Sequence, residues 1–251
     1  MRTDLEEAIE HLDTFGYCIL EDRIPAELAE SMAERFLEIH ADPDLQKYNT
    51  GDQYYQTLFG MLNLDDRVWT CASHPDVVAV AEHFLGPGVR VPEACSKPTW
   101  PGAGPGALHV DDGGYFHVVP NVPWLINSIW MLTDFTVENG ATGIVPLSHR
   151  SGRKGPPPEI TPDSDLIRPV TGRRGSVAIW HGGAYHMSRP NTSTDIRVGL
   201  NIPYYPRWWN VWMEGGHQPT WPETFERMPD AMKKLCAGRF GHTREEVYEQ
   251  V

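Results

Sequence analysis

The sequence predicts a fold that is mainly β with flanking helices (an α+β class), in which N-terminal helices precede a jelly-roll core. Two observations support this prediction. Residues 3–86 contain amphipathic segments with apolar side chains at helical spacing. From residue 88 onward, short apolar or alternating runs follow one another, separated by Gly, Pro, Asn and Asp. Runs at such spacing favour a double-stranded β-helix, the jelly-roll or cupin-like architecture.

The length of the chain favours one domain. Its 251 residues, 40% of them hydrophobic, are enough to bury a sizeable core. We expect a single domain over residues 1–251, and we see no internal repeat. Its expected parts are a helical N-terminal part over about 1–87, a jelly-roll core over about 88–210 and a C-terminal helical tail over about 211–251.

The first elements follow from capping and spacing. Thr3 and Glu6 form a capping box, and the helix that they begin should end near Gly16 after about a dozen residues. Further elements are expected at 17–20 (a strand), 25–40 and 74–86 (helices) and 47–61 (a loop or lid). Within the last segment, Tyr54 and Tyr55 are read equally well as edge packing.

The jelly-roll strands are expected where apolar runs lie between turn residues. These runs are 89–95, 107–110, 124–135, 142–148, 175–181 and 198–205. Residues 151–165 are too rich in Pro and Gly for a central strand and predict a long surface loop. Residues 223–238 predict helix with a proline interruption.

Composition excludes several classes of partner. With 21 basic and 34 acidic residues the net charge is −13, so the surface repels nucleic acids and anionic membranes. The basic stretches 149–154 and 172–174 are short, and we interpret them as exposed loop charges. No apolar run approaches the roughly 18–20 residues that cross a bilayer. We expect a small-molecule substrate, and the sequence leaves a homo-oligomer open.

The cysteines and the N-terminus indicate the compartment. The four cysteines (Cys18, Cys71, Cys95 and Cys236) lie far apart and form no CxxC pair, which predicts free thiols in a reducing environment. The acidic, amphipathic start of the chain lacks the basic flank and apolar stretch of a signal peptide. We therefore expect a cytoplasmic protein.

The stretch "ALHVDDGG" (107–114) contains a candidate metal site. In an extended chain His109 and Asp111 project from the same side, while Asp112 faces the turn or solvent. Imidazole and carboxylate so placed make two legs of the 2-His-1-carboxylate facial triad of non-haem Fe(II) oxygenases. A His-x-Asp pair is common by chance, so on its own it favours a polar turn.

A second histidine changes this interpretation. His186 follows an apolar strand, and Arg197 enters the next strand eleven residues later. A guanidinium buried in the same barrel needs an anionic partner, and a dicarboxylate cosubstrate would pair with it bidentately. Ser188 shares the face of His186. His181 competes as the distal ligand, but the spacing to Arg197 favours His186.

Two other histidines are interpreted differently. His149 is read as a structural hydrogen-bonding residue rather than a ligand. His117, beyond the double glycine, is read as solvated or as part of a pocket wall.

Together these motifs resemble the phytanoyl-CoA dioxygenase family of Fe(II)- and 2-oxoglutarate-dependent oxygenases. The features that carry the resemblance are His109-x-Asp111, "VENGATGIVPLSHR" (137–150), "GSVAIWHGGAYH" (175–186), "PNTSTDIRVGL" (190–200) and the opening "FGYCILEDRIPAEL" (15–28). The resemblance spans nearly the whole chain.

The resemblance implies a role for each site residue. His109, Asp111 and His186 would bind Fe(II), and Arg197 with Ser188 would hold the distal carboxylate of 2-oxoglutarate. Three further positions complete the candidates: Ser128 as a cosubstrate contact, Thr142 in the family's "ENG-x-T" turn, and Lys97 or Ser96 on the preceding strand.

The resemblance also implies the reaction. O2 would be the oxidant, succinate and CO2 the by-products, and the outcome hydroxylation, desaturation or ring formation. Related halogenases replace the carboxylate at the position of Asp111 with a small residue, so Asp111 argues against halogenation.

Two other functions stay open at this point. One is a non-catalytic metal-binding jelly-roll protein with a binding or regulatory role, and Arg197 discriminates because such a protein has no need of it. The other is an oxygenase acting on a macromolecule, which the negative charge disfavours for nucleic acids. Loops 47–60, 115–124 and 151–168 are expected to set the substrate. The cluster 208–213, rich in tryptophan, lines a substrate pocket or packs in a core or oligomer interface.

Overall fold

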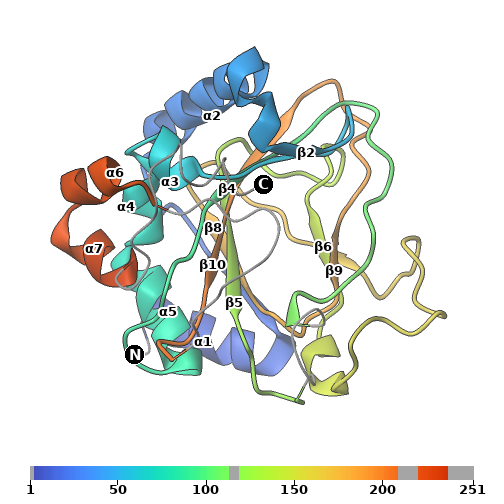
Figure 1. Cartoon of the computed structure of the whole chain (residues 1–251). Coiled ribbons are helices and arrows are strands. Elements are labelled where there is room, and N and C mark those ends of the chain that lie inside the picture. The colour runs from blue at the N-terminus through green and yellow to red at the C-terminus, as the bar shows by residue number, and fades with distance from the viewer. Residues whose placement is uncertain (1–2, 113–118, 209–219, 237–251) are drawn as a thin grey trace.

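The computed structural model describes residues 3–112, 119–208 and 220–236. Figure 1 shows the arrangement: a large sheet runs through the middle of the molecule, helices cover one of its faces, and a smaller sheet lies on the other side. This is the mixed α+β, jelly-roll type of architecture expected from the sequence.

The sheets are antiparallel throughout. The large sheet has the order β1 (Tyr17–Leu20), β8 (Val177–His181), β5 (Ile126–Met131), β10 (Arg197–Tyr204), β4 (Cys95–Thr99), β3 (Gln56–Leu58) and β2 (Asn49–Gly51). The small sheet has the order β7 (Arg168–Pro169), β6 (Thr142–Ile144) and β9 (His186–Ser188). Several neighbours in the large sheet, such as β1 with β8 and β5 with β10, are distant in sequence.

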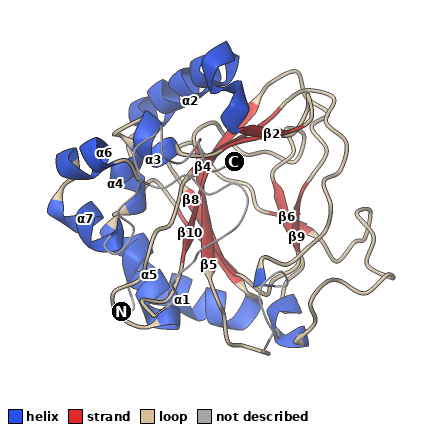
Figure 2. Cartoon of the chain, in the orientation of Figure 1, coloured by secondary structure: helices blue, strands red, loops and turns tan. Residues whose placement is uncertain are grey.

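The helices, drawn in blue in Figure 2, lie mainly on one side of the large sheet as a helix layer, with α6 and α7 farthest from it. They are α1 (Asp4–Phe15), α2 (Ala26–Ala41), α3 (Met61–Leu64), α4 (Val68–Ala72), α5 (Pro75–Leu85), α6 (Pro222–Arg227) and α7 (Asp230–Cys236). Short 3-10 helices occupy Pro43–Tyr48 and Ser148–Ser151. Leu12 and Phe36 from this layer pack with Trp130 and Ile202 of the sheet in the main hydrophobic core.

Successive side chains of β5 point alternately into two hydrophobic clusters, one on each face of the large sheet. Ile126 and Trp130 belong to the core beneath the helices. Ile129 and Met131 belong to a second cluster on the opposite face, together with Ile144 of the small sheet. Side chains at odd positions of β5 therefore point into the space between the sheets, where the candidate site lies.

The N-terminal elements agree with the sequence expectation. The Thr3–Glu6 capping box is present, and α1 ends at Gly16 with a left-handed φ of 87°. There is little room for any other residue at that turn, because a Cβ on Gly16 would lie 2.6 Å from Nδ1 of His149.

Three expectations differ from the structure. The segment 47–61 is less irregular than expected, since β2 and β3 extend the large sheet there. The segment 89–95 becomes a strand only at Cys95, and 107–110 makes one isolated bridge at His109. Both are short because Pro and Gly flank them and remove or displace ladder hydrogen bonds.

The expected surface loop, the interrupted C-terminal helix and the free cysteines agree with the structure. Residues 152–167 form a loop without helix or strand, and Pro229 separates α6 from α7. The four cysteines are free and buried. The single-domain boundaries stay a prediction, and most of the expected tail over 211–251 lies outside the described residues. Among the helices that the structure describes, none combines the length and apolarity of a membrane span.

Replacing Phe36 by alanine should lower the free energy of unfolding by about 3–5 kcal/mol, because the ring is lost from a fully buried position in the main core. Phe15→Ala is the matched control: its ring is 38% exposed, and its loss should cost less than about 1 kcal/mol. Urea denaturation of both variants measures the difference. Equal losses would contradict the packing described.

Stability should fall in mild acid, in part because of His40. Burial lowers the pKa of this histidine to about 4, whereas an unfolded histidine titrates near 6.5. Between these pH values the unfolded chain binds the extra proton, so the free energy of unfolding decreases as pH falls from about 6.5 to about 4. His40→Gln should remove up to about 1.4 kcal/mol per pH unit from that slope. His83→Gln, at an exposed histidine of α5, is the control and should leave the slope unchanged.

Candidate metal centre

His109 and His186 are held together by the backbone. Each peptide N–H donates to the other residue's carbonyl at 3.0 Å, so the two form a hydrogen-bonded cross-strand pair. Their side chains therefore leave the same face, with ring centroids 4.2 Å apart. Nδ1 of each ring donates to a carbonyl two residues earlier, that of Ala107 (2.9 Å) and that of Ala184 (3.0 Å). This fixes the tautomer that leaves both Nε2 atoms free to bind a metal.

Asp111 completes the cluster. Its Oδ1 lies 3.6 Å from Nε2 of His109 and 3.5 Å from Nε2 of His186. The three ligand atoms all lie within 4.8 Å of one another. Peptide N–H of Asp111 donates to the carbonyl of Gly182 at 2.9 Å, which ties the loop to the turn before β9.

The other carboxylate oxygen of Asp111 is occupied by protein donors. Asn127 Nδ2 donates to Oδ2 at 2.9 Å and Trp180 Nε1 donates at 3.1 Å. Asn201 in turn donates to Oδ1 of Asn127 at 2.7 Å. These bonds direct Oδ1 alone towards the histidines, so the carboxylate is prepared to bind a metal through one oxygen.

The ionisation of the cluster suits a divalent cation. Burial opposes ionisation of Asp111, but His186, His109 and the Asn127 amide outweigh it and hold the carboxyl pKa well below its usual range. Burial lowers the pKa of His186 to about 4. Burial also opposes protonation of His109, yet the adjacent carboxylate prevails and raises its pKa. At neutral pH the cluster thus presents a carboxylate and a neutral His186, the forms that bind metals.

Asp112 departs from the sequence expectation that it faces the turn or solvent. It is fully buried, and its Oδ2 accepts the peptide N–H of Trp124 at 3.4 Å. A Cβ on Gly182 would lie 2.2 Å from Oδ1 of Asp112, so the carboxylate lodges against this glycine. Burial raises its pKa to about 7. Asp112 lies inside because its peptide N–H, like that of Asp111, donates to the carbonyl of Gly182 and holds this segment against the turn before β9.

Arg197 lies at the start of β10 and is 1% exposed. Nη2 donates to the hydroxyl of Thr99, and the guanidinium carbon stands 4.5 Å above the ring centroid of Phe135. Nε and Nη1 are buried and have no hydrogen-bond partner among the described residues. Burial lowers its pKa to about 10, which leaves the group charged at neutral pH. Such a group requires an anion, and a carboxylate presents two oxygens to two nitrogens.

Two further candidates meet across the small sheet. Thr142 of β6 is the direct partner of Ser188 of β9, and Ile144 is the partner of His186. Paired residues of an antiparallel sheet point to the same side, so Thr142 and Ser188 share the face of His186. Their placement is compatible with the cosubstrate roles that the sequence suggested.

Ser128 does not point towards the cluster. Its hydroxyl donates to the carbonyl of Ile202 at 2.8 Å, and its even position on β5 faces the helix layer. The inward polar side chain of this strand is Asn127, which the sequence reasoning missed. The only sign of it in the sequence was a polar residue near the start of the apolar run 124–135. Because successive side chains of a strand point to opposite faces, an error of one residue assigns the wrong side chain to the site.

The two alternative candidates on β4, Ser96 and Lys97, also lie on opposite faces of their strand. Ser96 faces the helix layer and contacts Nε2 of His40 at 3.0 Å. Lys97 lies on the opposite face, and its charge lowers the pKa of His186, as burial does more strongly. Lys97 is therefore the residue of the two that faces the site.

His149 and His181 are not ligands in this arrangement. His149 Nε2 donates to the carbonyl of Asp13 at 3.2 Å, which fits the structural role expected for it. His181 accepts the peptide N–H of Gly183 at 2.9 Å, and burial lowers its pKa to about 3. It is outside the ligand cluster. His117 and residues 209–213 of the tryptophan cluster lie outside the described residues.

The site combines two imidazoles and one carboxylate with a buried arginine on the inward face of the large sheet, and this arginine requires an anion. This combination defines a class of protein. It is the class of mononuclear non-haem iron oxygenases that take an organic acid as cosubstrate. The donor set and the unpartnered nitrogens of Arg197 fit iron and 2-oxoglutarate respectively.

Comparison with known proteins agrees with this class. Residues 12–199 match the family model of phytanoyl-CoA dioxygenase. The chain is 27% identical to "Dioxygenase af480" of Aspergillus fumigatus, over 82% of this chain and 68% of that protein. It is 23% identical to "Dioxygenase andF" of Emericella variicolor, over 94% of this chain and 86% of that protein.

Solved structures share the fold. One is the epimerase SnoN in complex with Fe3+, alpha ketoglutarate and nogalamycin RO, with a TM-score of 0.65 and 17% identity over 80% of this chain and 83% of that one. Another is the non-heme alpha ketoglutarate dependent carbocyclase SnoK from nogalamycin biosynthesis, with a TM-score of 0.65 and 20% identity over 82% and 87% of the two chains.

The chain belongs to the phytanoyl-CoA dioxygenase family. It is an enzyme, a dioxygenase, as expected from the sequence. Family membership decides against the non-catalytic metal-binding protein that the sequence had left open.

Asn127→Ala should weaken Fe(II) binding about 10–100-fold, because the carboxylate of Asp111 loses a donor that orients it. Anaerobic Fe(II) titration followed by calorimetry measures the change. Ser128→Ala is the matched control: the neighbouring side chain faces the helix layer, so its loss should leave both Fe(II) and 2-oxoglutarate affinity at the wild-type value. A weakened 2-oxoglutarate affinity in Ser128→Ala would restore the cosubstrate contact expected from the sequence.

Proposed function

We propose that this dioxygenase oxidises an organic small molecule of the secondary-metabolite kind. In this proposal His109, Asp111 and His186 bind Fe(II), and Arg197 binds the distal carboxylate of 2-oxoglutarate. The observation that carries it is the pairing of a preorganised triad with a buried guanidinium that has two unsatisfied nitrogens. A metal site without a cosubstrate would have no use for that charge.

Bound together, Fe(II) and 2-oxoglutarate supply the oxidation of an unactivated C–H bond by O2, with release of succinate and CO2. The chain's own residues position the reactants. His109, Asp111 and His186 would hold the ion, and the cosubstrate would bind it beside them. Asn127 and Trp180 hold Oδ2 of Asp111, which keeps the carboxylate from occupying a second position.

The cosubstrate end of the site is built by neighbouring strands. Arg197 is flanked by Thr99 and Phe135, whose ring covers one face of the guanidinium and excludes water from it. Ser188 and Thr142 supply hydroxyl groups from the small sheet. We assign these hydroxyl groups to polar contacts with 2-oxoglutarate. We assign Lys97 to the part of the site that holds the negative charge of the cosubstrate.

The substrate class rests on charge and on the relatives. The net charge of −13 disfavours a nucleic acid. SnoN was solved with nogalamycin RO, and SnoK takes part in nogalamycin biosynthesis. Because Asp111 occupies the carboxylate position of the triad, hydroxylation, desaturation or ring formation is favoured over halogenation.

Anaerobic addition of Fe(II) and 2-oxoglutarate to the wild-type protein should give a weak metal-to-ligand charge-transfer band in the visible spectrum. Arg197→Ala should weaken the band by lowering 2-oxoglutarate affinity, because the distal carboxylate loses its bidentate partner. His186→Ala should abolish it. Absence of the band in folded, iron-loaded wild-type protein would overturn the proposed function.

Asp111→Ala should lose Fe(II) binding and the slow, substrate-free conversion of 2-oxoglutarate to succinate. The reason is that the ion loses its only charged ligand of the triad. Succinate is measured by chromatography after aerobic incubation, and Fe(II) by a chelator assay. Full succinate formation by this variant would show that the triad is wrongly assigned.

A further inference from the structure

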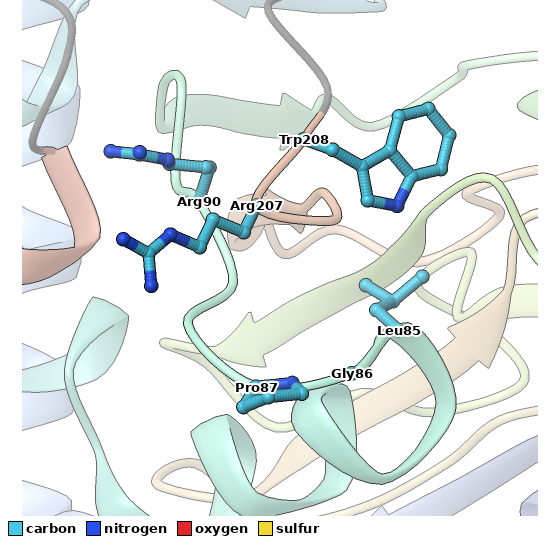
Figure 3. Close-up of a pocket in the computed structure, with 6 residues that line it drawn as sticks. All are labelled: Leu85, Gly86, Pro87, Arg90, Arg207 and Trp208. Atoms are coloured by element: carbon cyan, nitrogen blue, oxygen red, sulfur yellow. The ribbon is translucent and has the colours of Figure 1, made fainter.

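A cavity of about 490 Å³ lies at the end of α5, where the chain leaves the helix layer. Its lining consists of Leu85, Gly86, Pro87, Arg90, Arg207 and Trp208. The peptide groups of Arg90 and Tyr205 bond to each other in both directions at 2.8 Å, which fixes the segment of Arg90 beside the end of β10. Figure 3 shows both guanidinium groups extending in the same direction.

This cavity contains two cations, the guanidinium groups of Arg90 and Arg207. Nη1 of Arg90 is buried without a hydrogen-bond partner, and among the described residues no carboxylate pairs with Arg90 or Arg207. Some other arginines of this acidic chain do have carboxylate partners, as Arg67 has Asp65 and Arg227 has Asp66. Two like charges facing one cavity repel each other, and an anion between them removes both the repulsion and the unmet donor.

The rest of the wall is apolar. Leu85 and Pro87 contribute aliphatic surface, and the indole of Trp208 is 66% exposed at the rim. Ligand sites combine such walls with a few convergent polar groups, and their volumes lie in the range of about 300–1,000 Å³. The lining therefore matches a molecule with a charged end and an apolar body.

We propose that this cavity is a second binding site, for an organic anion whose carboxylate or phosphate lies on Arg90 and Arg207 and whose apolar body packs against Leu85 and Trp208. The site is distinct from the one at Arg197. It does not depend on the iron or on the proposed oxidation.

The cavity lies next to residues that hold the loop of His109 and Asp111 in place. Trp208 stacks edge-on against Trp124, with ring centroids 5.9 Å apart and an interplanar angle of 83°. The peptide N–H of Trp124 donates to Asp112, the neighbour of the ligand Asp111. A ligand against Trp208 therefore lies next to the residues that hold this loop in place.

The test is calorimetric titration of metal-free protein with octanoate, octyl phosphate and neutral octanol. Both anions should bind, octanol at least about tenfold more weakly, because only the anions satisfy the guanidinium pair. The tighter anion identifies the head group. Arg90→Gln and Arg207→Gln should each weaken the anions at least about tenfold, while Arg153→Gln, at an exposed loop arginine, should not. Equal affinity for octanol, or no effect of the cavity variants, would overturn the proposal.

Two further measurements separate this site from the metal centre and from a structural role. His186→Ala should bind the better anion as tightly as wild type, and competition of that anion by 2-oxoglutarate would instead place it at Arg197. In the absence of ligand, Arg90→Gln/Arg207→Gln should melt at or above the wild-type temperature, because like-charge repulsion is removed. A lower melting temperature would mean that the arginines serve the fold, and would overturn the proposal.

Discussion

The backbone pairing of His109 with His186 is the constraint on which the site depends. It joins a loop that belongs to neither sheet to a strand of the small sheet, through two hydrogen bonds of 3.0 Å. Once these residues are paired, their rings must leave on one side, and Asp111 two residues later must follow them. Backbone geometry thus brings three ligands to one face, two from residues 109–111 and one from the start of β9.

The large sheet supplies what that pairing cannot. Its inward face carries Asn127, Trp180 and Asn201, which orient the carboxylate, and Arg197, which awaits an anion. Buried polar groups are tolerated there because nearly every one bonds to another or is left for a ligand. The side of the same strands that faces the helices is mostly apolar and packs against them, so stability and chemistry occupy opposite sides of one sheet.

Much of this was accessible from the sequence, and the failures have a common cause. Helices with caps, the strand-rich second half and the triad follow from spacing within single segments. The identity of the inward residue of β5 does not, because "LINSIWML" is apolar at both parities and leaves Asn127 and Ser128 indistinguishable. Asp112 was misjudged for a related reason: its burial is produced by Gly182, seventy residues away in sequence. Pairings between distant strands carry information that local periodicity lacks.

The unequal exposure of the three ligands has a consequence for how metal is acquired. The side chain of His109 is 51% exposed, that of Asp111 18% and that of His186 8%. An arriving ion would meet the accessible imidazole of His109 before the two recessed ligands. Uptake and release of the metal would then both pass His109, so a molecule that covers this side chain should slow metal exchange.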